Sequence, residues 1–154
     1  MMDSFDTELN NVLVETFRSI LKVEEVALKN TGMKDLSISE MHLLETVGKN
    51  KESGRTISDI AQEAGITLPS VTIAINKLEK KGYVQKIKSG DDGRMVYVVL
   101  TKIGKKIDSV HRYFHEQMIR KVSKDLSKDE KAILLKGIKG LNEFFIKKAA
   151  DIDK

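Results

Sequence analysis

The apolar residues in the middle of the chain follow two different periods in turn. Helical spacing comes first, in Ile57, Ile60, Ala61 and Ala64. It predicts a short helix over Ile57–Ala64 that begins after the capping residue Thr56 and ends at the turn residue Gly65. A second helix, capped by Thr67, is expected to run to Lys81. Two helices joined by such a turn are typical of a helix–turn–helix unit.

The second of these helices is predicted to bury one face and expose the other. Val71, Ile75 and Leu78 recur at i, i+4 and i+7 and are expected to point inward. Pro69 fits the first turn, where backbone N–H groups have no helical partner to lose. The outer surface then carries Leu68, Ser70, Thr72, Ile73, Asn76, Lys77 and Lys80. This outer surface is expected to enter a DNA major groove.

A strand-like pattern follows the second helix. Val84–Lys88 and Met95–Leu100 are rich in β-branched residues, and Ser89–Gly93 between them has strong turn chemistry. These segments predict a β-hairpin, the wing of a winged helix–turn–helix. Its basic side chains are Lys86, Lys88 and Arg94. Arg94 at the hairpin tip suits a narrow minor groove or a phosphate, with Asp92 holding its guanidinium in place.

The rest of the chain is predicted to be helical, so the fold class is mainly α with a small β-wing. One helix is expected over about Asp3–Lys29 and another from Ser37 or Ser39 to the loop that starts at Gly48, with Glu40 spaced for a capping box with Ser37. A long helix follows the wing, with apolar residues at Ile103, Ile107, Val110, Phe114, Met118 and Val122. A final helix is expected from near Ser127, where Glu130 again has capping-box spacing.

The two terminal helices carry apolar stripes that exceed the needs of a single chain. The first has Phe5, Leu9, Val12, Leu13, Phe17, Ile20, Leu21 and Val23, and the last has Ile133, Leu134, Ile138, Leu141, Phe144 and Phe145. Pairing with a second subunit explains them better, which predicts a two-fold homodimer that offers two recognition helices to a pseudo-palindromic site. We therefore expect one domain in which residues 37–101 bind DNA and residues 1–36 and 102–154 form the helical dimerisation region.

Charge and composition support a nucleic-acid partner. Residues 55–106 carry ten Lys and Arg against five Asp and Glu, a net charge of +5, whereas the full chain has only +4. Positive charge is thus concentrated on the segment that would meet phosphates. The absence of cysteine and of any long apolar run favours a cytoplasmic protein without disulfides or a membrane span.

Other classes of function find little support in the sequence. The chain has no Ser-His-Asp spacing and no glycine-rich phosphate loop, so an enzyme is not expected. A helical interaction module that does not bind DNA is the alternative from another class, and in that case the basic wing would be incidental. Tight, salt-dependent duplex binding separates the two.

Several motifs stand out within this order of elements: Val71-Thr72, the segment Asn76–Val84, Asp92-Gly93-Arg94 and Leu100-Thr101. With the order of elements, they make nearly the full chain resemble the MarR family of winged-helix regulators. Many members have a basic residue where this chain has Ile73, so Ser70, Thr72 and Asn76 are the expected base readers here. The full predicted DNA-binding set is Thr67, Pro69, Ser70, Thr72, Asn76, Lys77, Lys86, Lys88, Asp92 and Arg94.

Three further segments look like one branch of that family. They are Val23–Val26, Lys34–His42 and His111–His115, and the branch represses fatty-acid biosynthesis genes in Gram-positive bacteria. Its corepressor is long-chain acyl-acyl carrier protein. The resemblance therefore implies an acyl-chain effector, an apolar channel near the dimer helices and no required cofactor.

The three histidines form a second candidate site. His111 and His115 are four residues apart on one predicted helix and so project from the same face, a spacing that lets two imidazoles share a metal. His42 lies on another helix. Glu24 matches a metal-binding carboxylate in the zinc-responsive branch of the same family, whose primary site also uses three histidines. In this chain, the four residues Glu24, His42, His111 and His115 would form an N₃O site suited to zinc.

The histidine cluster leaves two interpretations open. It is either the sensor of a zinc-responsive repressor of metal uptake or a hydrogen-bonded polar cluster that joins helices. The second metal site of the zinc-responsive branch has no counterpart here, because Asn30 and Met41 stand where ligands would be needed.

Overall fold

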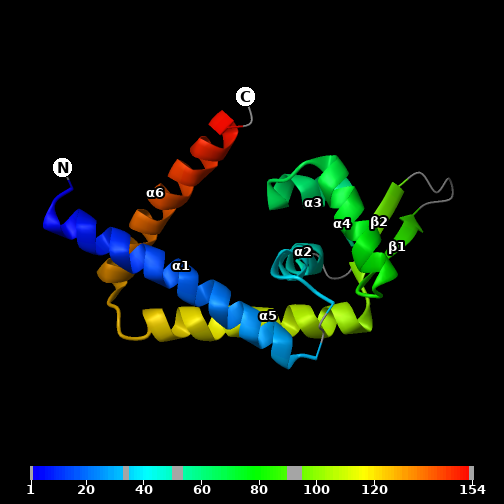
Figure 1. Ribbon diagram of the computed structural model, residues 1–154, viewed down its shortest axis with the longest axis horizontal. Helices are drawn as coiled ribbons and strands as arrows, with labels where there is room; N and C mark the ends of the chain where they lie inside the picture. The colour runs from blue at the N-terminus through cyan, green and yellow to red at the C-terminus, as the bar shows by residue number, and fades with distance from the viewer. Residues whose placement is uncertain (1, 33–34, 50–53, 90–94, 153–154) are drawn as a thin grey trace. The chain divides into compact units, whose positions relative to one another are not determined.

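The protein is seen in a computed structural model that describes residues 2–32, 35–49, 54–89 and 95–152 (Figure 1). The chain forms two compact units, residues 1–111 and 112–154. The helices are α1 (Ser4–Asn30), α2 (Ile38–Gly48), α3 (Ile57–Ala64), α4 (Leu68–Lys80), α5 (Lys102–Ser123) and α6 (Lys128–Ile152), and the strands are β1 (Val84–Ser89) and β2 (Met95–Leu100). This mainly helical chain with one small antiparallel sheet confirms the predicted fold class.

The helix starts are set by local side-chain caps. Ser37, rather than Ser39, caps α2, and its hydroxyl and the Glu40 carboxylate each accept a backbone N–H of the other residue, at 3.2 and 2.8 Å. Thr56 forms the same reciprocal pair with Asp59 at α3. Ser127 and Glu130 form it at α6. The predicted caps are confirmed, whereas Gly48 ends α2 instead of starting the loop.

The wing has an additional backbone connection beyond its own two strands. β1 and β2 pair in antiparallel register from Val84 opposite Leu100 to Ser89 opposite Met95. Arg55, just before α3, also bridges to Val98 of β2: the Arg55 N–H donates to the Val98 carbonyl at 3.0 Å, and the Val98 N–H donates back at 2.7 Å. β2 is therefore hydrogen-bonded to β1 along one edge and to Arg55 along the other.

The core of the first unit is built by α2, α3, α4 and the wing. Its largest fully buried side chains are Leu44, Val47, Ile60, Val71, Ile75, Leu78, Val84 and Val98. Val71, Ile75 and Leu78 are the residues predicted for the inner face of α4, and that prediction is confirmed. One continuous apolar cluster thus fixes α4 and the wing on the same support.

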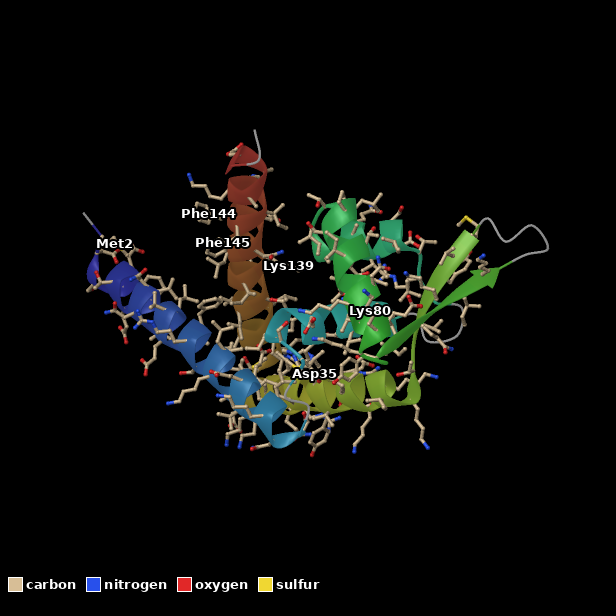
Figure 2. The ribbon with its side chains drawn as sticks, turned by 45° about the vertical axis from the view of Figure 1, so that its right-hand side comes forward. Met2, Asp35, Lys80, Lys139, Phe144 and Phe145 are labelled. Carbon is tan, nitrogen blue, oxygen red and sulfur yellow. The ribbon has the colours of Figure 1, made fainter. Side chains whose placement is uncertain are left out.

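The terminal helices leave much of their apolar surface uncovered. On α1, the side chains of Phe5 and Phe17 are 68% and 65% exposed. On α6, Phe144 and Phe145 (Figure 2) are also exposed, and their rings pack edge to face with centroids 5.3 Å apart. Among the residues described, no helix combines the length and the apolar character needed to cross a membrane.

Candidate DNA interface

α4 exposes the face opposite the core. Thr67 caps its N-terminus, and its hydroxyl accepts the Ser70 N–H at 3.4 Å. The exposed side chains are Leu68, Pro69, Ser70, Ile73, Asn76, Lys77 and Lys80, the last labelled in Figure 2. Most of these are residues predicted to bind DNA, and their contact with DNA stays a prediction.

The hydroxyls on this face differ in what they can offer a base. The Thr67 and Ser70 hydroxyl oxygens lie 2.8 Å apart and share one hydrogen bond, so one of their two protons stays available for DNA. The Thr72 hydroxyl donates to the Leu68 carbonyl at 2.8 Å. Thr72 therefore presents an oxygen acceptor and a methyl group rather than a donor.

The end of α4 directs the chain straight into the wing. Gly82 adopts a φ of 81°, in the left-handed region that favours glycine. Its N–H donates to the Glu79 carbonyl and the Tyr83 N–H donates to the Leu78 carbonyl, both at 3.0 Å. This pair of bonds is the Schellman termination of a helix. It makes a sharp turn, after which β1 starts at once.

Lys86 of β1 ties the wing to the recognition helix. Its Nζ donates to Asn76 Oδ1 and lies 3.2 Å from Glu79 Oε2, and its backbone N–H donates to Glu79 Oε1 at 3.1 Å. Because an ammonium group has only donors, Asn76 must turn its oxygen toward it. Lys86 was predicted to contact DNA, and the structure places its charge between two α4 side chains. Glu79 was not predicted, since helix-to-strand contacts have no signature in the spacing.

Glu40 at the start of α2 binds Lys77 of α4 and Lys81, the residue that caps the end of α4. Its carboxylate lies 2.9 Å from Lys81 Nζ and 3.2 Å from Lys77 Nζ. Burial alone would raise the pKa of Glu40, but the bonds from Lys81, the Ser37 backbone and Lys77 outweigh it and lower the pKa to about 2. Lys77, predicted to bind DNA, is 62% exposed and so can still reach a phosphate.

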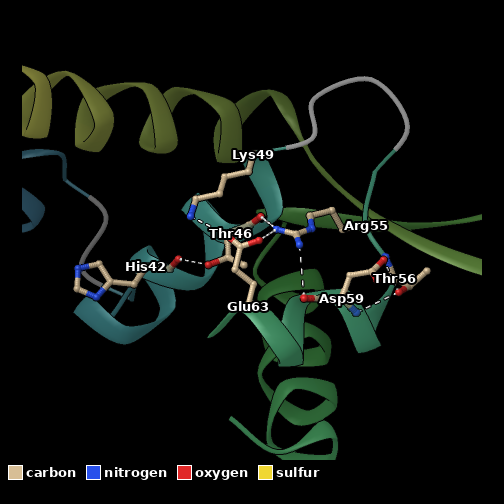
Figure 3. Close-up of polar contacts among 7 residues, drawn as sticks. All are labelled: His42, Thr46, Lys49, Arg55, Thr56, Asp59 and Glu63. Carbon is tan, nitrogen blue, oxygen red and sulfur yellow. Dashed lines mark hydrogen bonds and ion pairs between the residues drawn. The ribbon is translucent and has the colours of Figure 1, made fainter. Parts of the chain in front are cut away.

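Arg55 joins α2 to α3 (Figure 3). Its guanidinium donates to the Thr46 carbonyl at 3.1 Å and to the Asp59 carbonyl at 3.5 Å, and it forms a close ion pair with Glu63. Lys49 of the loop after α2 lies 2.5 Å from the same Glu63 carboxylate, and hydrogen bonds from Lys49 and Arg55 lower the pKa of Glu63. With its backbone bridge to β2, Arg55 locks the helix–turn–helix to the wing.

Thr101 and Gly104 join the end of the wing to α5. The Thr101 hydroxyl donates to the Gly82 carbonyl at 2.7 Å and accepts the Gly104 N–H at 3.2 Å, while the Thr101 N–H donates to the Tyr83 carbonyl. A Cβ added at Gly104 would lie 2.1 Å from the Tyr83 carbonyl oxygen. Only glycine permits this approach. Thr101, which follows the wing, has a structural role through these hydrogen bonds.

Two predicted wing residues, Asp92 and Arg94, lie outside the described residues. Lys88, further along β1 than Lys86, is exposed.

Glu24 brings two histidines together in the first unit. Its side chain is buried, and Oε1 lies 3.2 Å from His42 Nε2 and 3.3 Å from His111 Nε2. The two imidazole centroids are 5.2 Å apart, and His111 Nδ1 lies 3.1 Å from Glu45 Oε2. Burial opposes ionisation of Glu24, but the bonds to His42 and His111 prevail and lower its pKa.

The geometry of this cluster is compatible with both interpretations of it. Distances of 3.2 and 3.3 Å are hydrogen-bond lengths. They also match the edge of a tetrahedron of zinc ligands, about 3.3 Å for metal bonds of about 2.0 Å. His115, the fourth predicted ligand, lies one helical turn beyond His111 on α5. Whether the group binds metal stays a prediction.

Comparisons with known proteins agree with this architecture. Residues 34–95 match the model of the MarR family. The uncharacterized HTH-type transcriptional regulator YfiV of Bacillus subtilis (strain 168) is 32% identical over 144 residues, which cover 86% of this chain and 87% of YfiV. A second regulator of the same organism, YhjH, is 28% identical over 105 residues, or 68% of this chain, and the matched part spans only 58% of YhjH.

A solved structure with a similar fold is that of FabT from Streptococcus pneumoniae in complex with DNA. It is 36% identical to this chain, with a TM-score of 0.79 and coverage of 92% of this chain and 97% of FabT. YfiV and YhjH are transcriptional regulators, in agreement with the expectation that the chain is not an enzyme. The chain belongs to the MarR family of DNA-binding, winged helix–turn–helix transcriptional regulators.

Proposed function

We propose that this chain is a homodimeric repressor of fatty-acid biosynthesis genes that responds to long-chain acyl-acyl carrier protein. The observation that carries the proposal is the 36% identity to FabT over 92% of the chain. The segments Val23–Val26, Lys34–His42 and His111–His115 add to it, because they resemble the branch of the family with that role.

DNA is engaged by the outer face of α4 in the major groove and by the wing on the flanking backbone. Support comes from the face of α4, which exposes hydroxyl, amide and ammonium groups while Val71, Ile75 and Leu78 are fully buried. The net charge of +5 on residues 55–106 attracts phosphates to the same segment. Arg94 then belongs at the wing tip as a phosphate or minor-groove contact.

Dimerisation places two such units on a pseudo-palindromic operator. It is supported by the uncovered apolar side chains of α1 and α6, among them Phe5, Phe17, Phe144 and Phe145. Large apolar side chains left exposed along a helix are typical of an interface with another protein. A closed two-fold pair would cover it with the same helices of a second copy.

The test is a titration of metal-stripped protein on a labelled duplex from upstream of fatty-acid biosynthesis genes, followed by fluorescence anisotropy. We expect long-chain acyl-acyl carrier protein to tighten binding, whereas the carrier protein without an acyl chain has no effect. Salt-dependent duplex binding excludes the helical module that does not bind DNA. DNA binding that ignores the acylated carrier would contradict the proposed effector and leave the regulator itself intact.

A zinc-responsive repressor of metal uptake is the second candidate. It is favoured by Glu24, whose single carboxylate oxygen lies at 3.2 and 3.3 Å from the Nε2 atoms of His42 and His111. These residues, with His115, would hold the ion, and zinc would act by fixing α1, α2 and α5 together. In the same titration zinc alone would tighten DNA binding, and Glu24→Gln would abolish that effect. Equal binding with and without zinc would leave the cluster structural.

A further inference from the structure

Ile73 lies at the centre of the outer face of α4. It is separated from Pro69 and Lys77 by one turn on either side, and Ser70 and Asn76 flank it at a spacing of three residues. Its side chain is 70% exposed, while Val71 and Ile75 on the opposite face are fully buried. The core therefore makes no use of this large β-branched side chain, although it occupies the middle of the surface proposed to face DNA.

Its neighbour Asn76 is held in one orientation. Lys86 Nζ donates to Asn76 Oδ1, so the amide oxygen is engaged and the two Nδ2 hydrogens remain for another acceptor. Ile73 and Asn76 are three residues apart and so are neighbours on the helix surface. Together they present an apolar group beside a hydrogen-bond donor.

One base edge in the major groove matches this pair. Thymine presents a C5-methyl group next to the O4 acceptor, whereas cytosine presents an N4 donor and no methyl group. Contact between an isoleucine side chain and this methyl group is favourable, because it removes apolar surface from water. A cytosine in the same place would set its N4 donor against the Asn76 donor.

We propose that Ile73 recognises the C5-methyl group of a thymine in the operator while Asn76 donates to a base acceptor beside it. The inference rests on the proposed docking of α4 in the major groove. Specificity at this position would then come from apolar contact and be insensitive to salt.

The test uses a duplex that the wild-type protein selects from a random-sequence pool. Every thymine in it is replaced by deoxyuridine, which removes the methyl groups and keeps all base pairs. Burying one methyl group is worth about fourfold in affinity, so a symmetric dimer that covers two should lose about fifteenfold on the uracil duplex. Single replacements should locate the loss at two symmetry-related positions.

The variants are Ile73→Ala, Ile73→Val and the control Ile119→Ala. Ile73→Ala should bind the thymine and uracil duplexes equally, and Ile73→Val should show an intermediate ratio. Ile119 is a similarly exposed isoleucine on α5, at 59%, and its replacement should leave the wild-type ratio of affinities unchanged. The ratio is the readout, so a general loss of affinity in a variant does not imitate the expected result.

Two results would overturn the inference while leaving DNA binding in place. One is equal affinity of the wild-type protein for the two duplexes. The other is a preference for thymine that persists unchanged in Ile73→Ala, which would assign the methyl effect to DNA shape or to another side chain. If no duplex is selected at all, the docking of α4 is wrong and the inference fails with it.

Discussion

The buried carboxylate of Glu40 should make the free energy of unfolding of this protein depend on pH. Its pKa is about 2 in the folded protein against an ordinary value of 4.5. One pKa unit corresponds to about 1.4 kcal/mol, so the ionised carboxylate contributes about 3 kcal/mol to the free energy of unfolding at neutral pH. Because the folded-state pKa is the lower of the two, this contribution is complete above about pH 4.5 and is lost as the pH falls toward 2.

The substitution Glu40→Gln removes the charge and keeps the shape of the side chain. Glutamine can still accept the Ser37 N–H at the start of α2, so the loss falls on the contacts with Lys77 and Lys81. At pH 7 the variant should be less stable than the wild type by about 3 kcal/mol. The two free energies of unfolding should converge as the pH falls below 4.5.

The assay is urea unfolding followed by circular dichroism at one protein concentration, from pH 7 down to the lowest pH at which both proteins fold. Glu25→Gln is the control, since Glu25 pairs with Lys29 on the exposed surface of α1, and it should change stability little. A gap between wild type and Glu40→Gln that stays constant with pH would refute the reasoning, because the effect would then come from packing and not from ionisation.

Three further substitutions test the contacts that connect α4, the wing and α5. Gly104→Ala should destabilise the protein by about 2 kcal/mol or more in urea unfolding, because its Cβ would lie 2.1 Å from a backbone oxygen. Gly137→Ala is the control, since its Cβ would meet open space, and it should stabilise the protein. Equal effects of the two substitutions would contradict the close contact at Gly104. Thr101→Val should cost about 1–3 kcal/mol in the same assay, and no loss would show that its hydroxyl bonds are dispensable. Lys86→Met should lower the preference for operator over random duplex without changing the salt slope, because Lys86 orients Asn76. A slope reduced by about one would instead make Lys86 a phosphate contact.

The sequence sufficed for features that depend on neighbouring residues. The caps at Thr56 and Ser127, the turn at Gly65 and the inner face of α4 all follow from residues within a few positions of one another. Local hydrogen bonds and periodic burial decide these elements, so they can be predicted without knowing the tertiary fold.

The sequence did not suffice where distant elements meet. Glu40 and Lys81 are 41 positions apart, and no local pattern pairs them. Arg55 has no periodic signature, because it acts from a single residue between α2 and α3. The partners of Lys86 on α4 could not be predicted either, since spacing alone does not separate a solvated lysine from a paired one.

The bridge between Arg55 and Val98 limits how this regulator can respond to an effector. Two backbone bonds form there, Lys86 contacts α4, and Thr101 bonds to the turn that follows α4. In the described residues these contacts leave no hinge between the helix–turn–helix and the wing. The helix–turn–helix and the wing of one subunit, which together we call its reading head, should therefore move as one rigid body. An effector would then act by changing the separation of the two reading heads in the proposed dimer, so its signature would be a changed preference for the number of base pairs between half-sites.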